Sequence, residues 1–370
     1  MISRRTFLSA PALLAVSSRR VPVPQQIKSF CIDFNWRRPR VAGWINDFAP
    51  PGHWADASPA EHVAWYREMG ANVIQTFAVS CNGYAWYKGG FVPPQPGLKF
   101  DFLPEVVERG HSAGFMVMGY FCAAANTKWG LENKELSYGA PSAQHIPFTD
   151  EYLDYLARSI EDALRRTGMD GFMIDWVWTP GAKVRQSGWL EAERKLFEKL
   201  TGRRFPAGGE PDAELMLAYE RVAIDRCWKR IRAVTKRTNR NALIWLACSN
   251  LTDPRIVNSR MLGEADWILN EAPNPDYLEV GRRMAGSHAR MIQCLVGWGD
   301  KHNAQDFLTD PRNQALDLYG FAEPRDNSLP LPAEVYLNQP IGSFAASDVH
   351  TANDRNIAAL ARFYRGLPIS

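Results

Sequence analysis

Hydrophobic and polar positions divide the chain into two kinds of segment that alternate along its length. Short apolar runs that fit buried strands cover residues 29–36, 72–79, 115–122, 171–178, 243–248, 267–270, 291–296 and 320–322. Segments with apolar residues at roughly helical spacing cover residues 58–69, 102–113, 149–166, 189–200, 214–238, 275–285 and 354–364, and residues 305–318 include a further helical segment. Strand runs that are apolar on both faces are typical of parallel sheets covered by helices.

Local signals support the boundaries of several predicted helices. Ser58 and Pro59 form a good helix start, because Ser accepts hydrogen bonds from free amide groups and Pro fits the first helical position. Gly70 and Gly168 are placed to end the first and third predicted helices.

Eight alternations of strand and helix, without a long linker, predict a single α/β domain over residues 26–370. We expect a closed (β/α)8 barrel of the TIM type with long loops after its strands. An open doubly wound sheet is the alternative, but no Gly-x-Gly-x-x-Gly turn follows the first strand.

The first 25 residues have the pattern of a targeting segment followed by a short linker. Ser3-Arg4-Arg5-Thr6-Phe7-Leu8 precedes a short apolar run over residues 10–16, as in twin-arginine export signals. The run is too short to span a bilayer, and no cysteine near Ser17 offers a site for a lipid anchor. We therefore expect a periplasmic or secreted bacterial protein that meets the twin-arginine export machinery and has no stable membrane anchor.

Composition excludes some classes of function. A net charge of +3, with 46% hydrophobic and 22% charged residues, describes a globular protein without a general electrostatic affinity for nucleic acid. There are six cysteines, four of them within predicted strands, and no Cys-x-x-Cys pair. Twin-arginine cargo is expected to fold before export, so we interpret most of these cysteines as small buried hydrophobic residues.

The residues Asp170-Gly171-Phe172-Met173-Ile174-Asp175-Trp176-Val177-Trp178 are the most informative part of the chain. An ionisable Asp175 near the end of a buried strand is costly unless it faces a cleft at the carboxyl end of the barrel. We interpret Asp175 as a catalytic carboxylate. The alternative is a buried Asp that caps the next helix or pairs with an arginine.

Glu271 is the preferred partner of Asp175, because it also ends an apolar strand run, residues 267–271, and is followed by a turn at Ala272-Pro273. Hydrolysis of a glycosidic bond needs one ionised and one protonated carboxyl group, which lie about 5–5.5 Å apart in a retaining enzyme. We assign Asp175 as nucleophile and Glu271 as general acid/base. Glu323 is the rival acid, and a helix cap or rim salt bridge is the alternative role for Glu271.

Further polar and aromatic residues stand at the predicted carboxyl ends of strands, where barrel enzymes place their substrate contacts. Aromatic faces stack on sugars, and carboxylates and amides bind hydroxyl groups. The candidate substrate-binding residues are Asp33, Trp36, Asn82, Tyr84, Trp86, Tyr120, Trp176, Trp178, Asn250, Trp298, Glu323 and Arg325. An internal structural hydrogen bond is the alternative for Asp33, and core packing is the alternative for each single tryptophan.

Other chemistries find little support in the sequence. His53, His145 and His302 lie in predicted loops without the spacing of a metal pair or of a Ser-His-Asp triad. Neither a Gly-x-Ser-x-Gly elbow nor a Gly-x-x-x-x-Gly-Lys phosphate loop is present. We expect no metal and no cofactor. A metal-dependent hydrolase would need several ligands within about 2.0–2.2 Å of one point.

Several motifs resemble α-L-fucosidases (glycoside hydrolase family 29) and related hypothetical glycoside hydrolases. They are residues 72–77, 84–87, 98–101, 115–121 and, most specifically, the Asp-Gly-Phe-x-x-Asp strand at 170–175. The resemblance spans roughly residues 28–330. It implies a (β/α)8 barrel whose nucleophile is the Asp at the end of strand four, here Asp175. The early His-rich fucose-binding motifs of that family have no clear match in this sequence.

These observations predict an exported glycoside hydrolase that acts on an oligo- or polysaccharide, with a retaining mechanism and a resemblance to α-L-fucosidases. The alternative from a different class is a barrel that binds carbohydrate without cleaving it. Replacement of Asp175 by Asn distinguishes the two, because only an enzyme would lose its turnover.

Overall fold

A computed structural model describes residues 21–37, 41–139, 145–271, 276–296, 303–325, 327–344 and 354–369. The predicted export signal at residues 1–20 and the candidate Trp298 lie outside these described residues. In the described part of the chain, no helix combines the length and apolar character that crossing a membrane requires.

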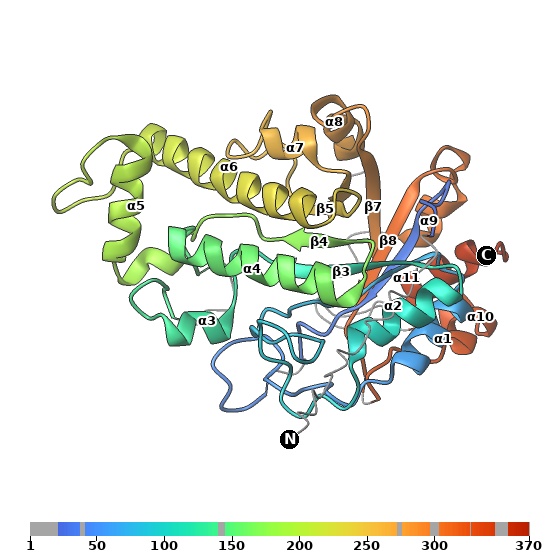
Figure 1. Cartoon of the computed structure of the whole chain (residues 1–370). Coiled ribbons are helices and arrows are strands. Elements are labelled where there is room, and N and C mark those ends of the chain that lie inside the picture. The colour runs from blue at the N-terminus through green and yellow to red at the C-terminus, as the bar shows by residue number, and fades with distance from the viewer. Residues whose placement is uncertain are drawn as a thin grey trace, which may run out of the picture.

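Eight parallel strands form a closed barrel in sequence order, and β8 pairs with β1 to complete the ring (Figure 1). The strands are β1 Lys28–Ile32, β2 Val73–Gln75, β3 Met116–Cys122, β4 Gly171–Asp175, β5 Leu243–Cys248, β6 Trp267–Asn270, β7 Arg290–Val296 and β8 Asp317–Ala322. The predicted (β/α)8 fold is thereby confirmed.

Helices cover the outside of the barrel, and several lie in the loops between strands (Figure 1). The α-helices are α1 Pro59–Met69, α2 Phe102–Ser112, α3 Thr127–Glu132, α4 Asp150–Thr167, α5 Glu191–Thr201, α6 Ala213–Thr238, α7 Arg260–Glu264, α8 Asp276–Met284, α9 Ala304–Thr309, α10 Ala333–Asn338 and α11 Asp354–Tyr364. Short 3-10 helices are η1 Val184–Ser187, η2 Pro311–Asn313 and η3 Ile341–Ser343.

The predicted caps form as the sequence indicates. The Ser58 hydroxyl accepts a hydrogen bond from the Glu61 amide at 3.3 Å, and Pro59 is the first residue of α1. Gly70 and Gly168 end α1 and α4 with φ angles of 77° and 70°, in the left-handed region that glycine adopts without a steric penalty. These caps set where the chain leaves each helix to enter the next strand.

The helical segment predicted within residues 305–318 is α9, which occupies only the first part of that range. Helix α9 ends at Thr309, η2 follows, and β8 already begins at Asp317. Helical backbone angles are disfavoured for a residue that precedes a proline. Asp310, which precedes Pro311, adopts an extended conformation and accepts a hydrogen bond from the Arg312 amide at 2.9 Å. The Asp310-Pro311 pair therefore stops the helix.

The cysteines behave as small apolar residues of the interior. All six are buried and none forms a disulfide. This confirms the interpretation of the cysteines as buried hydrophobic residues.

An aromatic layer packs between the barrel and its first two helices. Phe34 stacks on Trp86, with ring centroids 4.5 Å apart, and Phe102 closes the cluster from α2. His62 of α1 is embedded in this layer, 5.1 Å from the Tyr66 and Phe102 rings. Burial lowers the pKa of His62 from 6.5 to about 3, so the folded protein keeps this imidazole neutral.

We expect His62 to make the fold sensitive to acid. Between about pH 6.5 and pH 3 the unfolded chain binds a proton at His62 that the folded protein rejects, so stability falls as pH decreases. The slope from this residue is about 1.4 kcal/mol per pH unit. Urea unfolding of wild type and His62→Leu across this range should give a shallower pH dependence for the variant, and parallel curves would contradict the interpretation.

Candidate active site

Four acidic residues stand at the carboxyl ends of barrel strands. Asp175 is the last residue of β4, and Asp33, Glu271 and Glu323 directly follow β1, β6 and β8. The strands of the ring are parallel, so these ends lie at one face of the barrel.

Alternation along the strands directs these side chains toward the barrel interior. Trp245 of β5 contacts Trp267 of β6 and Tyr319 of β8, with ring centroids 5.4 and 5.3 Å apart, so these three side chains meet inside the ring. Side chains two and four residues along a strand share a face. Glu271 lies four residues after Trp267, and Glu323 lies four residues after Tyr319. Both side chains therefore continue the row that faces the barrel interior.

Two hydrogen bonds hold the Asp175 carboxyl group, one on each oxygen. The Tyr120 hydroxyl donates to Oδ2 at 2.8 Å, and the Trp176 amide donates to Oδ1 at 2.8 Å. Asp175 is partly exposed, and no arginine or lysine among the described residues forms an ion pair with it. The residues that follow it form a loop rather than a helix. Asp175 is thus neither a helix cap nor half of an arginine pair.

The carboxyl groups of Asp33, Asp175 and Glu271 have unlike pKa values. Burial raises the pKa of Asp175 to about 6, and the hydrogen bonds from Tyr120 and Trp176 oppose that rise. Burial raises the pKa of Glu271 to about 8, and the negative charges of Asp175 and Asp33 raise it further. At neutral pH, Asp175 is therefore mainly ionised and Glu271 mainly protonated.

Asp33 is part of a turn as well as of this acidic group. Burial raises its pKa to about 7, while a hydrogen bond from the Asn35 amide to Oδ1, 2.8 Å long, opposes the rise. Asn35 in turn accepts a hydrogen bond from the Cys81 amide at 2.8 Å. Asp33 thus makes the internal hydrogen bond and also raises the pKa of Glu271, and its contact with substrate stays a prediction.

An aromatic cluster adjoins Asp175. The Trp176 ring lies 6.2 Å from Trp36 and 5.7 Å from Phe48, and Trp36 and Phe48 are 4.9 Å apart. Trp176 is partly exposed, whereas the other two rings are buried. Its φ of 51° lies in the left-handed region, which costs a residue other than glycine about 1–3 kcal/mol.

The structure places some predicted substrate-binding residues in structural roles. Trp86 is fully buried in the aromatic layer beneath α2, and its indole nitrogen donates to the Ser80 hydroxyl at 2.7 Å. Asn82 is buried and exchanges hydrogen bonds with Gln95. Arg325 pairs with Asp354 of α11 at 2.5 Å. Trp86 and Asn82 are therefore engaged within the protein, whereas Arg325 is exposed and its contact with substrate stays a prediction.

The remaining candidates lie at or near the strand ends. Tyr84 is partly buried, with the Lys128 ammonium group 6.0 Å from its ring centre. The Arg255 guanidinium group covers the buried Trp178 ring at 4.6 Å. Asn250 is partly exposed and organises its own turn by accepting hydrogen bonds from Thr252. Glu323 is partly exposed beside β1.

Three residues of this region were not predicted from sequence. Phe48 completes the aromatic cluster, Asn35 orients the turn after β1, and Cys81 contacts the Tyr120 hydroxyl at 3.8 Å. A local signal exists only for Asn35, because Asp-x-Asn favours a turn closed by side-chain hydrogen bonds. Phe48 and Cys81 come from separate loops, so only the fold brings them near Asp175.

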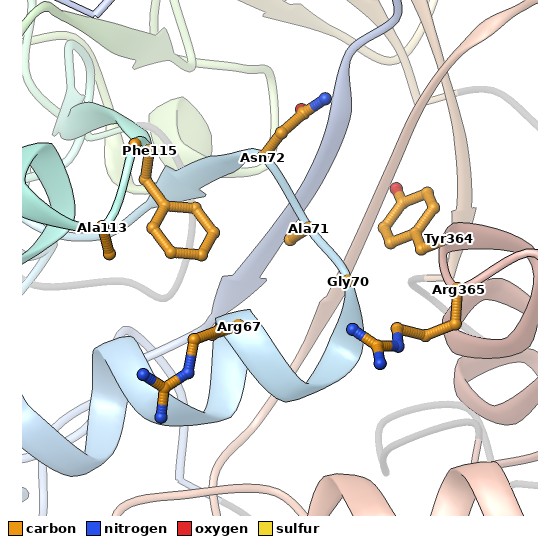
Figure 2. A pocket seen from close by; sticks show the side chains of 9 residues that line it. Arg67, Gly70, Ala71, Asn72, Ala113, Phe115, Tyr364 and Arg365 are labelled. Carbon is orange, nitrogen blue, oxygen red and sulfur yellow. The ribbon is translucent and has the colours of Figure 1, made fainter.

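A cavity of about 390 Å³ lies beside the amino-terminal ends of β2 and β3 (Figure 2). This is the end of the barrel opposite to the acidic residues. The cavity is lined by residues that precede β2 and β3, together with Arg67 and Arg365. The Tyr364 hydroxyl is already engaged with the Ser29 and Leu318 carbonyl groups. The active sites of (β/α)8 barrel enzymes lie at the carboxyl ends of the strands. We therefore do not assign this cavity to the candidate site.

The described residues contain no group of three or more His, Cys, Asp and Glu side chains that could hold a metal ion. Asp33, Asp175 and Glu271 thus share one face of the barrel without grouping as ligands would. What the arrangement offers chemically is one ionised and one protonated carboxyl group beside an aromatic surface.

Solved structures with a similar fold include two enzymes that act on carbohydrates. α-L-Fucosidase isoenzyme 2 from Paenibacillus thiaminolyticus has a TM-score of 0.62 and 14% identity, over 92% of this chain and 49% of that one. A β-galactosidase from Rahnella sp. R3 has a TM-score of 0.55 and 14% identity, over 89% of this chain and 57% of that one. This chain thus spans about half the length of these proteins, and identities this low show the fold alone.

Comparison by sequence points to one family. No curated protein matches the chain. Residues 58–176, from the Ser58 cap of α1 to the residue after Asp175, match the family described as hypothetical glycosyl hydrolase 6. The predicted resemblance to hypothetical glycoside hydrolases is confirmed over this segment, and the match supports a glycoside hydrolase.

Proposed function

We propose that this protein is a retaining glycoside hydrolase that cleaves a glycosidic bond in an oligo- or polysaccharide. The observation that carries the proposal is the pair of carboxyl groups at the ends of β4 and β6, with a pKa near 6 for Asp175 and near 8 for Glu271. This difference supplies an ionised nucleophile and a protonated acid at neutral pH. The match of residues 58–176 to a glycosyl hydrolase family supports the same reaction class.

The proposed reaction has two steps. Glu271 protonates the leaving-group oxygen while an Asp175 oxygen attacks the anomeric carbon, which forms a glycosyl ester and releases the first product. Glu271, now ionised, then removes a proton from water that attacks the same carbon, and the Asp175 carboxylate leaves. The Tyr120 and Trp176 hydrogen bonds keep the Asp175 carboxyl group in one orientation during both steps.

The partly exposed Trp176 ring, which packs on the buried Trp36 and Phe48 rings, provides an apolar surface beside the nucleophile. Such a surface suits the C–H face of a pyranose ring. For the sugar, we propose an α-L-fucoside or a related glycoside, on the basis of the Asp-Gly-Phe-x-x-Asp strand at residues 170–175. The similar fold of a bacterial α-L-fucosidase is compatible with this choice.

We expect replacement of Asp175 by Asn to remove nearly all turnover of the best substrate in a panel of aryl glycosides, because the amide cannot attack the anomeric carbon. The binding of the corresponding free sugar, followed by calorimetry, should persist. Asp170→Asn is the matched control. Asp170 directly precedes β4, at the end of the barrel opposite to Asp175, and its carboxyl group forms a hydrogen bond with the His111 ring at 2.8 Å.

The Asp170 variant should retain the activity of wild type per folded molecule, measured after its folded fraction has been determined by circular dichroism. Sugar binding without turnover in the wild-type protein would instead support the alternative of a carbohydrate-binding barrel. Inversion at the anomeric carbon, followed by proton NMR of the first product, would refute the retaining mechanism.

We expect kcat/KM to follow a bell-shaped pH profile with a maximum near pH 7. Activity should fall below about pH 6, where Asp175 becomes protonated, and above about pH 8, where Glu271 loses its proton. Because Asp33, Asp175 and Glu271 influence one another, the pKa values read from the two limbs belong to this group of acids rather than to single residues. In Glu271→Gln the upper limb should disappear for substrates whose leaving groups need no protonation, and a persistent limb would exclude Glu271 as the acid in favour of Glu323.

We also propose that residues 1–25 direct the protein through the twin-arginine export machinery to the periplasm or the medium. The support is the Ser-Arg-Arg-Thr-Phe-Leu pattern and the short apolar run that follows it. Arg4→Lys combined with Arg5→Lys should leave the folded protein in the cytoplasmic fraction of a bacterial host, where wild type is exported. Equal export of both proteins would contradict the assignment.

A further inference from the structure

A series of hydrogen bonds and contacts links Asp33 to Asp175 through Asn35, Cys81 and Tyr120. The Asn35 amide donates to Asp33 Oδ1, and Asn35 Oδ1 accepts from the Cys81 amide, both at 2.8 Å. The Cys81 thiol contacts the Tyr120 hydroxyl at 3.8 Å, and that hydroxyl donates to Asp175 Oδ2 at 2.8 Å. These contacts cross the carboxyl ends of β1 to β4, and Asn35, Cys81 and Tyr120 are buried.

The number of hydrogens on each group determines which atom donates in the Cys81–Tyr120 and Tyr120–Asp175 contacts. A tyrosine hydroxyl carries one hydrogen, and an ionised carboxylate can only accept. Tyr120 must therefore donate its hydrogen to Asp175, which leaves its oxygen free to accept from the Cys81 S–H group. Burial, the neighbouring Cys122 thiol and the charge of Asp175 raise the pKa of Cys81 well above its usual value, so the thiol keeps the hydrogen that this arrangement needs.

We infer that Tyr120 is a positioning residue for the nucleophile, and that the Cys81 thiol reinforces it as the second donor in a relay to Asp175. This role differs from the substrate contact predicted for Tyr120 from sequence. Only 5% of the Tyr120 surface is exposed, and its hydroxyl already has two partners. The inference rests on the proposed role of Asp175 as nucleophile, but the relay itself can be tested without any substrate.

The relay has a definite chemical consequence. A donor that bonds the carboxylate stabilises the charged form, so the Tyr120 hydroxyl holds the pKa of Asp175 below the value that burial alone would give. Together with the Trp176 amide, it occupies one lone pair on each oxygen and fixes the plane of the carboxyl group. Loss of the hydroxyl should therefore change both the charge state and the orientation of Asp175.

The first test is a direct titration of Asp175 in Tyr120→Phe. Carbon NMR of protein labelled at the aspartate carboxyl carbon, with Asp175→Asn used to assign the resonance, should give a pKa about 1–2 units higher than in wild type. Cys81→Ala should move the pKa in the same direction by a smaller amount, because it removes only the donor to Tyr120.

Tyr219→Phe is the matched control. Tyr219 is also buried and also donates to a carboxyl group, that of Glu193, at 3.0 Å, but this pair belongs to the helical layer formed by α5 and α6. The control variant loses the same kind of hydrogen bond and should leave the Asp175 titration unchanged. If Tyr120→Phe shifts the Asp175 pKa no more than Tyr219→Phe does, the relay is refuted.

The second test uses the activity. In Tyr120→Phe, kcat should fall about tenfold to a hundredfold with little change in KM, and the acidic limb of the pH profile should move to higher pH. A rise in KM with an unchanged acidic limb would instead make Tyr120 a substrate contact and overturn the inference. If the wild-type protein hydrolyses no glycoside, the proposed function fails, and the NMR titration still decides whether the relay exists.

Discussion

Pairing of β8 with β1 is the constraint on which the candidate site depends. The register joins Ile32 to Ala322, and the Asp33 amide continues it by donating to the Ala322 carbonyl at 2.8 Å. This closure places Asp33, from the first strand, on the same rim as the acids that follow β4 and β6. In an open sheet, β1 and β8 would be distant edges, and the carboxyl groups could not influence one another.

Once the barrel has gathered these acids, hydrogen bonds decide which of them carries a charge. Burial raises the pKa of Asp33, Asp175 and Glu271, but the Asp175 anion has donors on both oxygens. Within the described residues, no hydrogen bond opposes the raised pKa of Glu271, and two neighbouring negative charges raise it further. The two acids therefore separate in pKa although both lie at strand ends of similar sequence.

Much of the barrel could be predicted from periodicity because each strand and helix has a local pattern. The strands at 243–248 and 267–270 and the helix at 354–364 were predicted with their observed bounds. The short helices α3, α7 and α10 have five or six residues, too few to show a period, and they were missed.

The sequence by itself determined the fold class, the strand-end position of Asp175 and Glu271, and the burial of the cysteines, because these depend on residues close together in the chain. Only the tertiary structure decided that Trp86 and Asn82 are buried and that Arg325 forms an ion pair with Asp354. It also decided that Tyr120, Cys81 and Phe48 approach Asp175 and its aromatic neighbour. Those contacts join separate strands and loops, and a side chain's partners across the barrel depend on closure and register, which no local pattern records.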